Sequence, residues 1–336
     1  MRVTIKDIAE YTKLSITTVS LVLNNRPSRI TEETRQLVFD AAAKLNYTPN
    51  QMAVGLAKKR THMLGLIVGD LENNFFASLA TVVENTCNKR GWDMLLCSTS
   101  DCHSRDIEAI NLLVSRGVDG VLYTMSKDCT IEKALQSKEI FERNGLSVVM
   151  VDRSYHLEGE HSVVVDHEMG GYIATKHLLE YGHKDILFLS GPLHLSCAQN
   201  RLAGYKRALK EWKIKYNPGY IIKGDYSMQS GISAAEIVAK LPGTAIFASN
   251  DMMAFGLYKA KSKLKKKIPD EFSIIGYDDT SFCDLLAPPL TTIRQPIHEL
   301  GEAAVDRLIR VIDGDKYNEI QKFSPVLVKR GSVIKI

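Results

Sequence analysis

Residues 3–24 read VTIKDIAEYTKLSITTVSLVLN, and this stretch decides how the chain begins to fold. Thr4 is followed three residues later by Asp7, the spacing of a helix-capping box. Apolar residues then recur at helical spacing, which predicts a first helix over 5–12. After a three-residue turn the same periodicity predicts a second short helix over 16–23.

A third helix follows. Ser15 is a favourable N-cap for the second helix, and Thr31 opens the third with Glu32 and Glu33 at its positive end. The third helix is expected to end before Pro49. Two short helices joined by a tight turn, followed by a supporting helix, describe a helix-turn-helix unit.

The outward face of the second helix consists of Ile16, Thr17, Thr18 and Ser20. Hydroxyls and one branched apolar group suit the major groove of DNA, where they can contact thymine methyls, base edges or phosphates. An ordinary surface helix would carry Lys and Glu at these positions. The alternative is a small three-helix module that binds protein.

The positive charge of the chain is concentrated at its N-terminal end. Residues 1–60 hold ten Lys/Arg and five Asp/Glu, whereas the remaining residues hold 33 basic and 34 acidic side chains. This distribution predicts an anionic partner, double-stranded DNA, for the N-terminal end alone.

Composition excludes several classes of protein. A chain of 336 residues without an apolar run of about 18 is expected to form two or three domains and no membrane span. The charged N-terminus lacks the apolar region of a secretory signal, so we expect a cytoplasmic location. Six scattered cysteines without CxxC pairing predict reduced structural thiols and no metal site.

From residue 63 onward, apolar strands alternate with amphipathic helices such as 76–90, 104–116 and 198–211. Near-continuous Val/Ile/Leu runs of this kind predict parallel sheets covered on both faces. So many strands suit two sheets better than one. The predicted strands are 63–69, 93–99, 120–125, 147–152, 161–167, 185–191, 220–224, 244–251, 272–279, 291–296 and 325–331.

Several predicted strands end in polar residues: Asp70, Asp152-Arg153, Asn250-Asp251 and Asp278-Asp279. Open parallel sheets bind ligands beyond the carboxyl ends of their strands. Two lobes facing each other there would form a hydrogen-bonding cage for a hydroxyl-rich ligand. No strand is followed by GxGxxG or GxxxxGK[ST], and GxSxG is absent, so we expect no nucleotide cofactor.

Residues 3–24 together with ITEETRQLVFDAAAKLNYTPN (30–50) resemble the headpiece of the lactose-repressor (LacI) family of bacterial transcription regulators. The resemblance continues through NNFFASLA (73–80), FASNDMMAFG (247–256), IIGYDDTSF (274–282) and PPLTTIRQP (288–296). It implies DNA contacts at Thr4, Ser15, Ile16, Thr17, Thr18, Asn24, Thr31, Asn50, Ala53 and Leu56.

Two departures from the family pattern concern the operator. Ile16 and Thr17 stand at the base-reading positions and cannot make bidentate amide–base contacts, and Leu21 replaces a basic or polar residue. In the family, paired hinge helices insert a leucine into the minor groove. The matching residue in NQMAVGLAKKR (50–60) is Leu56, beside Gly55, so we expect the hinge to fold only on DNA.

The resemblance also implies the domain organisation: a headpiece over 1–49, a hinge over 50–61 and a periplasmic-binding-protein-like core over 62–336. In the core, the first lobe is expected to comprise about 62–158 and 290–322, and the second about 159–289 and 323–336. The implied effector contacts are Phe75, Asp152, Arg201, Tyr226, Asn250 and Asp278.

These residues have a chemistry that suits a sugar. The two carboxyl groups can accept hydrogen bonds from vicinal hydroxyls, the arginine and the amide can donate, and the aromatic rings can stack on a sugar ring. A purine, a nucleoside or a phosphorylated metabolite is the alternative effector.

The predicted function is therefore an effector-responsive repressor of carbohydrate-utilisation genes that binds a pseudo-palindromic operator as a homodimer. The dimer contact is expected along the helix 76–90 and around Leu285-Leu286. The rivals are a solute-binding transport receptor, which would need a signal peptide, and an enzyme acting on sugars. The enzyme is disfavoured because Asp278 and Asp279, as neighbours on an extended segment, would point to opposite sides.

Overall fold

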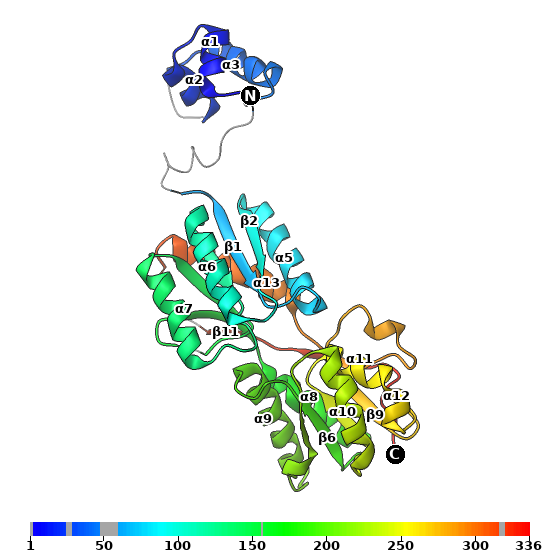
Figure 1. The fold of residues 1–336 in the computed structure, drawn as a ribbon. Helices are drawn as coiled ribbons and strands as arrows, with labels where there is room; N and C mark the ends of the chain where they lie inside the picture. Colours follow the sequence, from blue (N-terminus) through cyan, green and yellow to red (C-terminus); the bar gives the residue numbers. More distant parts are fainter. Residues whose placement is uncertain (1–2, 25–28, 48–59, 156, 316–319) are drawn as a thin grey trace. The chain divides into compact units, whose positions relative to one another are not determined.

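The computed structural model describes residues 3–24, 29–47, 60–155, 157–315 and 320–336. The chain forms two compact units, Met1–Thr61 and His62–Ile336. Figure 1 follows the chain through both units.

The first unit is a three-helix headpiece. Its helices are α1 (Ile5–Thr12), α2 (Ile16–Leu23) and α3 (Glu32–Lys44), which agrees with the sequence-based prediction. Both Thr4 groups, the backbone N–H and the hydroxyl, donate to the Asp7 carboxylate at 2.6 and 2.7 Å. The helices pack around a small core made of Ile8, Ala9, Val19, Val22, Val38 and Ala41.

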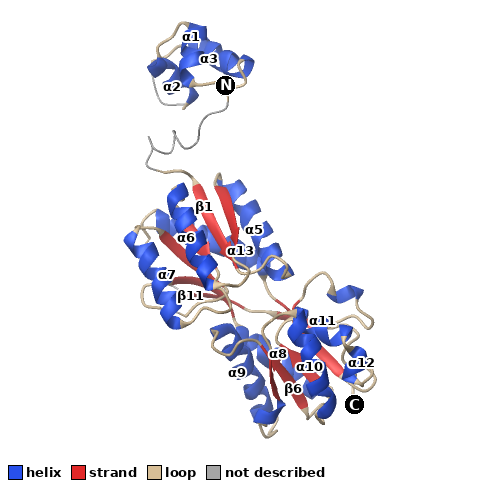
Figure 2. Ribbon diagram, in the orientation of Figure 1, coloured by secondary structure: helices blue, strands red, loops and turns tan. Residues whose placement is uncertain are grey.

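The second unit contains two six-stranded sheets (Figure 2). The first sheet has the order β11-β5-β4-β3-β1-β2, and its described strand pairs are parallel. Such an order requires crossovers, which is why helices cover both faces. Its strands are β1 (Met63–Val68), β2 (Asp93–Ser98), β3 (Gly120–Tyr123), β4 (Ser147–Val151), β5 (His161–Val165) and β11 (Ile320–Phe323).

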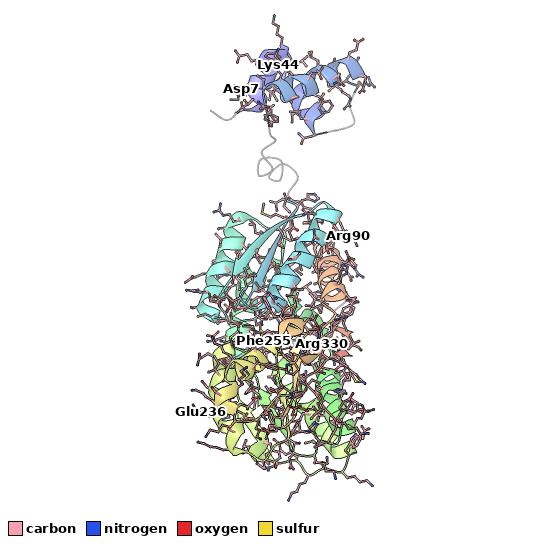
Figure 3. The ribbon with its side chains drawn as sticks, turned by 90° about the vertical axis from the view of Figure 1, so that its right-hand side faces the viewer. Asp7, Lys44, Arg90, Glu236, Phe255 and Arg330 are labelled. Atoms are coloured by element: carbon pink, nitrogen blue, oxygen red, sulfur yellow. The ribbon has the colours of Figure 1, made fainter. Side chains whose placement is uncertain are left out.

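Four helices cover the first sheet. α6 (His103–Arg116) and α7 (Ile131–Arg143) pack on one face, and α5 (Asn74–Arg90) and α13 (Ile297–Ile312) pack on the other. Arg90, the last residue of α5 and labelled in Figure 3, forms a two-pronged ion pair with Asp306 of α13, with Nε–Oδ1 at 2.9 Å. A helix that arrives late in the chain is thereby joined to the beginning of the lobe.

The second sheet has the order β12-β10-β9-β8-β6-β7 and is parallel except for the antiparallel pair β10–β12. Its strands are β6 (Ile186–Ser190), β7 (Ile221–Lys223), β8 (Ala245–Ala248), β9 (Ser273–Asp278), β10 (Thr291–Arg294) and β12 (Val326–Val328). The helical segments of this lobe are α8 (His167–Glu180), α9 (Ser196–Glu211), η1 (Pro218–Tyr220), α10 (Met228–Lys240), α11 (Asp251–Lys259), α12 (Lys261–Leu264) and η2 (Cys283–Leu285).

The expected lobe boundaries at 158/159 and 289/290 each fall one strand too early. β5 was assigned to the second lobe but pairs with β4 in the first sheet, whereas β10 was assigned to the first lobe but pairs with β9 in the second. The apolar sequence of a strand does not indicate which of the two sheets the strand will pair with. β11, with the sequence IQKF, was not predicted because it is only half-buried at the sheet edge.

The described residues contain no helix that is both long and apolar enough to cross a membrane. They also contain no cluster of three or more His, Cys, Asp or Glu side chains arranged to hold a metal ion. All six cysteines lie in the described ranges as free thiols.

Candidate functional site

Three of the predicted DNA-contacting residues stand at the N-termini of the three headpiece helices. Thr4, Ser15 and Thr31 are the N-caps of α1, α2 and α3. The Ser15 hydroxyl accepts from the Thr18 backbone N–H at 3.0 Å. Helix N-termini carry partial positive charge and free N–H groups, which suits them to phosphate oxygens.

The remaining described candidates lie on or next to α2. Ile16 and Thr17 are exposed, with half of the Ile16 side chain accessible to solvent. Thr18 shares a hydrogen bond of 2.8 Å with the Ser15 hydroxyl, and Asn24 donates to the Ser20 carbonyl at 2.8 Å. The start of α2 therefore presents a surface that can enter a groove.

Asn50, Ala53 and Leu56 lie outside the described residues, as does most of the predicted hinge.

In the core, all six predicted effector residues line one cavity at the carboxyl ends of the strands. Its volume is about 20 Å³, which is room for roughly one water molecule. Pockets for small ligands usually measure about 300 Å³ or more, so an effector needs more room than this conformation offers. The full lining is Asn73, Phe75, Phe76, Asp152, Arg153, Cys197, Arg201, Tyr226, Asn250, Asp278 and Gln295.

A buried network centred on His167 joins the two lobes beside this cavity. Asp152, which follows β4 of the first lobe, lies 3.1 Å from Nε2 of His167, the first residue of α8. The other ring nitrogen, Nδ1, faces the Tyr277 hydroxyl at 3.1 Å and the Arg201 guanidinium at 3.3 Å. Because arginine can only donate, Nδ1 must accept, and the ring proton lies on Nε2 and points to Asp152.

His167 is not among the residues that the sequence predicts to bind the effector. Its position as the last residue of the predicted strand 161–167 was the one signal available.

Arg201 is held in place from several sides. It donates to the Ser249 carbonyl and lies 3.8 Å from the Tyr277 ring centroid and 5.6 Å from that of Tyr226. Asn250 is the N-cap of α11 and donates to the Tyr226 carbonyl at 2.9 Å. These contacts fix the donors of the cavity before any ligand binds.

The two cavity carboxyl groups have opposite pKa shifts. Burial raises the pKa of Asp152, but the His167 hydrogen bond and the nearby charges outweigh it, so the pKa lies below its usual value. Burial, followed by the neighbouring Asp251 carboxylate, raises the pKa of Asp278 well above its usual value. The cavity therefore offers one carboxylate that accepts and one carboxyl group that can also hold a proton.

Some lining residues were not predicted. Gln295 donates to Asp278 at 2.6 Å, and its Oε1 has no hydrogen-bond partner among the described residues. Cys197 lies four residues before Arg201 on α9, a spacing that could have identified it. Of the other polar residues at the ends of predicted strands, Arg153 lines the cavity, whereas Asp70 does not.

Polar contacts hold the lobes together around the cavity. Ser196 donates to the Ser154 carbonyl at 2.7 Å, and the Asn74 amide donates to the Ser281 hydroxyl at 3.1 Å. Lys127 lies 3.7 Å from Asp225. Contacts of this kind are weak enough to break when the lobes open.

Three of the six predicted effector-binding residues have backbone conformations that L-residues rarely adopt. The φ angles are +63° at Asp152, +69° at Tyr226 and +128° at Asp278. Strained backbone of this kind is typical of functional sites.

Comparison with known proteins identifies the family. Residues 4–50 match the model of the bacterial regulatory proteins of the lacI family, and residues 175–333 match a periplasmic binding protein-like domain. The chain is 34% identical over 337 residues to the HTH-type transcriptional repressor PurR of Vibrio campbellii, and the alignment covers 99% of each. The chain belongs to the LacI family.

Solved LacI-family structures agree with this assignment. The lac repressor dimer bound to operator and the anti-inducer ONPF superposes with a TM-score of 0.89 at 28% identity, covering 99% of this chain and 100% of that one. A LacI-family regulator from Enterococcus faecium with bound ribose gives 0.71 at 30% identity, covering 82% and 99%. The predicted family, the helix-turn-helix headpiece and the two parallel-sheet lobes are confirmed. As a LacI-family member, the protein is a DNA-binding transcription regulator that responds to a small-molecule effector.

Proposed function

We propose that this regulator represses carbohydrate-utilisation genes and binds an unphosphorylated sugar or glycoside between its lobes. The observation that carries the proposal is the convergence of Asp152, Arg201, Asn250 and Asp278 on one cavity with the rings of Phe75 and Tyr226. Carboxyl, guanidinium and amide groups together match the alternating donors and acceptors of a polyol. The ribose bound to the Enterococcus faecium relative supports the same class.

The charges of the cavity favour a neutral ligand. Its two guanidinium groups are already engaged, Arg153 by Asp101 and Arg201 by Ser249 and His167. Asp152 and Asp278 lie beside them. A phosphorylated metabolite would bring negative charge toward the Asp152 carboxylate, so it is the second candidate together with purines and nucleosides.

We propose further that the protein binds its operator as a homodimer, as the lac repressor does in its operator complex. Exposed apolar side chains at Phe282 and Leu285, the latter 78% exposed, support a contact in this part of the second lobe. Two headpieces would then read two half-sites of a pseudo-palindromic operator. Such a protein acts where the DNA lies, so we propose a cytoplasmic location.

The positions of the Asp278 and Asp279 carboxyl groups favour a regulator over an enzyme. Asp278 faces the cavity, whereas Asp279 is paired with Arg294 and Arg330 at 2.6 and 2.7 Å. The adjacent acids therefore do not flank one ligand bond, as a glycosidase would require.

A thermal-shift screen of the full chain tests the effector class. Sugars, sugar phosphates, nucleosides and purines are compared at millimolar concentration. We expect one sugar to raise the melting temperature of the core, because a ligand at about 100 times its Kd stabilises the folded state by about 2.7 kcal/mol. Asp278→Asn should abolish the shift.

Asp70→Asn is the matched control, because Asp70 also follows a strand but does not line the cavity. A shift produced only by phosphorylated compounds or by purines would overturn the sugar proposal. DNA binding is measured separately, by fluorescence anisotropy with the DNA upstream of the gene that encodes the chain. Binding no stronger than to random DNA would contradict repression of its own operon.

A further inference from the structure

His167 stands where the chain passes from the first lobe to the second. β5 ends in the first sheet at Val165, and α8 begins at His167 and packs in the second lobe. The His167 side chain is buried, and it does not line the effector cavity. A buried polar ring needs hydrogen-bond partners, and two of those that His167 has, Asp152 and Arg201, do line the cavity.

Two glycines near the start of α8 allow this helix to reach its partners. An added Cβ at Gly170 would collide with the Tyr277 hydroxyl, and one at Gly171 would collide with the Arg201 backbone carbonyl. Such a close approach is possible only without a side chain. The start of α8 therefore lies directly against β9 and α9, which places the His167 ring beside groups from both lobes.

The neutral His167 ring gives each partner a different role. Its Nε2–H donates to Asp152 at 3.1 Å, and this is the one hydrogen bond that the Asp152 carboxylate receives from the described residues. Its Nδ1 accepts from Arg201 at 3.3 Å. Burial and then the Arg201 charge lower the pKa of His167, so the ring stays neutral at physiological pH. One side chain thereby fixes an acceptor of the first lobe and a donor of the second.

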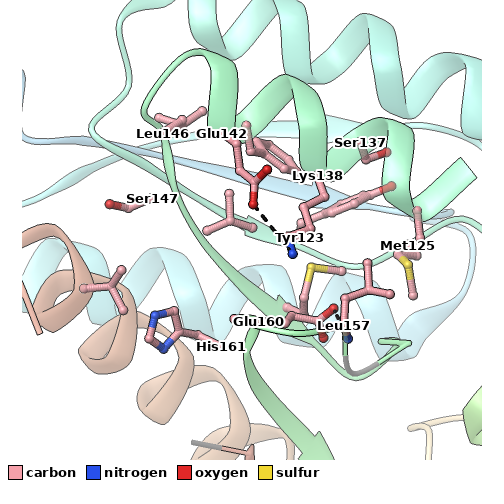
Figure 4. Close-up of a pocket in the computed structure, with 16 residues that line it drawn as sticks. Tyr123, Met125, Ser137, Lys138, Glu142, Leu146, Ser147, Leu157, Glu160 and His161 are labelled. Carbon is pink, nitrogen blue, oxygen red and sulfur yellow. Dashed lines mark hydrogen bonds and ion pairs between the residues drawn. The ribbon is translucent and has the colours of Figure 1, made fainter. Parts of the chain in front are cut away.

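The first lobe contains a second cavity, of about 240 Å³, beside α7 (Figure 4). Its lining includes Tyr123 and Phe141 but none of the three groups that the His167 ring contacts. The contacts of His167 therefore bear on the effector cavity and not on this second cavity.

We propose that His167 is a positioning residue of the effector cavity: it orients Asp152 as an acceptor and Arg201 as a donor before the effector binds. The inference rests on the proposed effector role of this cavity but not on the effector being a sugar. An effector then meets groups whose orientation is already fixed, which lowers the entropy cost of binding. Loss of the ring should therefore weaken effector binding although His167 itself does not line the cavity.

Nuclear magnetic resonance of the full chain tests the tautomer without any ligand. Histidine labelled with ¹⁵N gives separate signals for protonated and unprotonated ring nitrogens in two-bond ¹H–¹⁵N spectra. The His167 signals are those that disappear in His167→Gln. At pH 7 we expect a protonated Nε2 and an unprotonated Nδ1. The opposite tautomer, or a ring with both nitrogens protonated, would overturn the proposal.

Isothermal titration calorimetry on the full chain tests the effect on binding. D-Ribose is the first probe, because a relative holds ribose, and adenosine and D-ribose 5-phosphate are the second and third. His167→Phe keeps an aromatic ring but can neither donate nor accept, so it should weaken the probe that binds by roughly 10- to 100-fold. His167→Gln keeps an uncharged donor and acceptor and should restore the affinity to within about 3-fold of wild type. His183→Gln, at a buried histidine outside the cavity, is the matched control and should leave the affinity unchanged.

A double-mutant cycle separates positioning from general damage to the fold. If His167 acts through Asp152, His167→Phe should cost less affinity in an Asp152→Ala background than in the wild type, whereas independent losses would multiply. If His167→Phe does not fold by circular dichroism, His167→Asn takes its place, because its shorter side chain cannot reach both partners.

Three binding results would overturn the proposal: wild-type affinity in His167→Phe, a loss in His167→Gln as large as in His167→Phe, or the same fold loss with and without Asp152→Ala. Binding of adenosine or D-ribose 5-phosphate in place of D-ribose would overturn the sugar proposal alone, and the variants would then be compared with that probe. No saturable heat from any of the three probes would overturn both proposals.

Discussion

The headpiece and the effector cavity place their functional residues in opposite environments. In the headpiece, Ile16 and Thr17 stand exposed on a helix, and folding depends on a separate group of buried side chains. In the cavity, Asp152, Arg201 and Asn250 are themselves buried, and hydrogen bonds to His167, Ser249 and Tyr226 hold them in place. A surface site can therefore change its specificity without changing stability, whereas the cavity cannot.

Replacement of Arg201 by methionine gives the largest expected effect and tests the cavity side of this comparison. The change keeps the apolar bulk but leaves the Ser249 carbonyl without its arginine donor, and it leaves His167 Nδ1 with only the Tyr277 hydroxyl. Loss of one partner of a buried charged network costs about 3–5 kcal/mol. Urea denaturation should show this loss in the core, and affinity for the effector should fall at least ~100-fold.

Arg201→Lys is the control, because it keeps the charge and loses the two-pronged geometry. If Arg201→Met binds the effector poorly and yet unfolds at the wild-type urea concentration, binding and stability are separable in the cavity and the comparison fails.

Thr17→Ala tests the headpiece side and should give an intermediate effect. Loss of one specific base or phosphate contact weakens operator binding by about 1–2 kcal/mol, or roughly 5- to 30-fold. Thermal unfolding should stay unchanged, because Thr17 is exposed. Anisotropy titrations with operator and random DNA give the ratio of the two affinities. Gln36→Ala, at an exposed position on α3, serves as the control.

An equal loss of affinity for operator and random DNA would show that Thr17 contributes no specificity.

The smallest effect concerns pH. All nine histidines lie beyond residue 61, so histidine titration affects the core and not the headpiece. Burial and then the Lys329 charge lower the pKa of His177 to about 4. Between about pH 4 and 6.5 the unfolded chain binds this proton and the folded chain does not, so stability rises with pH across this window.

His177→Gln isolates this contribution. The difference in unfolding free energy between wild type and variant should increase from pH 4 to 6.5 and level off above it, measured by urea denaturation of the core. A difference in unfolding free energy that stays constant with pH would contradict the lowered pKa of His177.

The comparison also explains what the sequence could predict. Headpiece helices are local, so capping signals at Thr4 and Ser15 sufficed to place them, and the structure reproduces those caps. Cavity residues were found because the ends of parallel strands converge and because the family resemblance marked six positions. Convergence of strand ends and family resemblance each identify individual residues, but neither identifies the contacts between residues.

Features that depend on distant partners were not predictable. The sequence shows no reason for β5 to join one sheet and α8, which follows it, the other lobe. His167 is interpreted through Asp152 and Arg201, which lie on different lobes.

The positive φ angles at Asp152, Tyr226 and Asp278 have a consequence for evolution. Glycine would relax the backbone at each of these positions, yet it would delete the group that faces the ligand. The binding groups are therefore retained against a conformational cost that other residues of the core must offset. Selection for thermostability alone would erode the cavity first, so drift at these three positions would be an early sign that the regulator has lost its ligand.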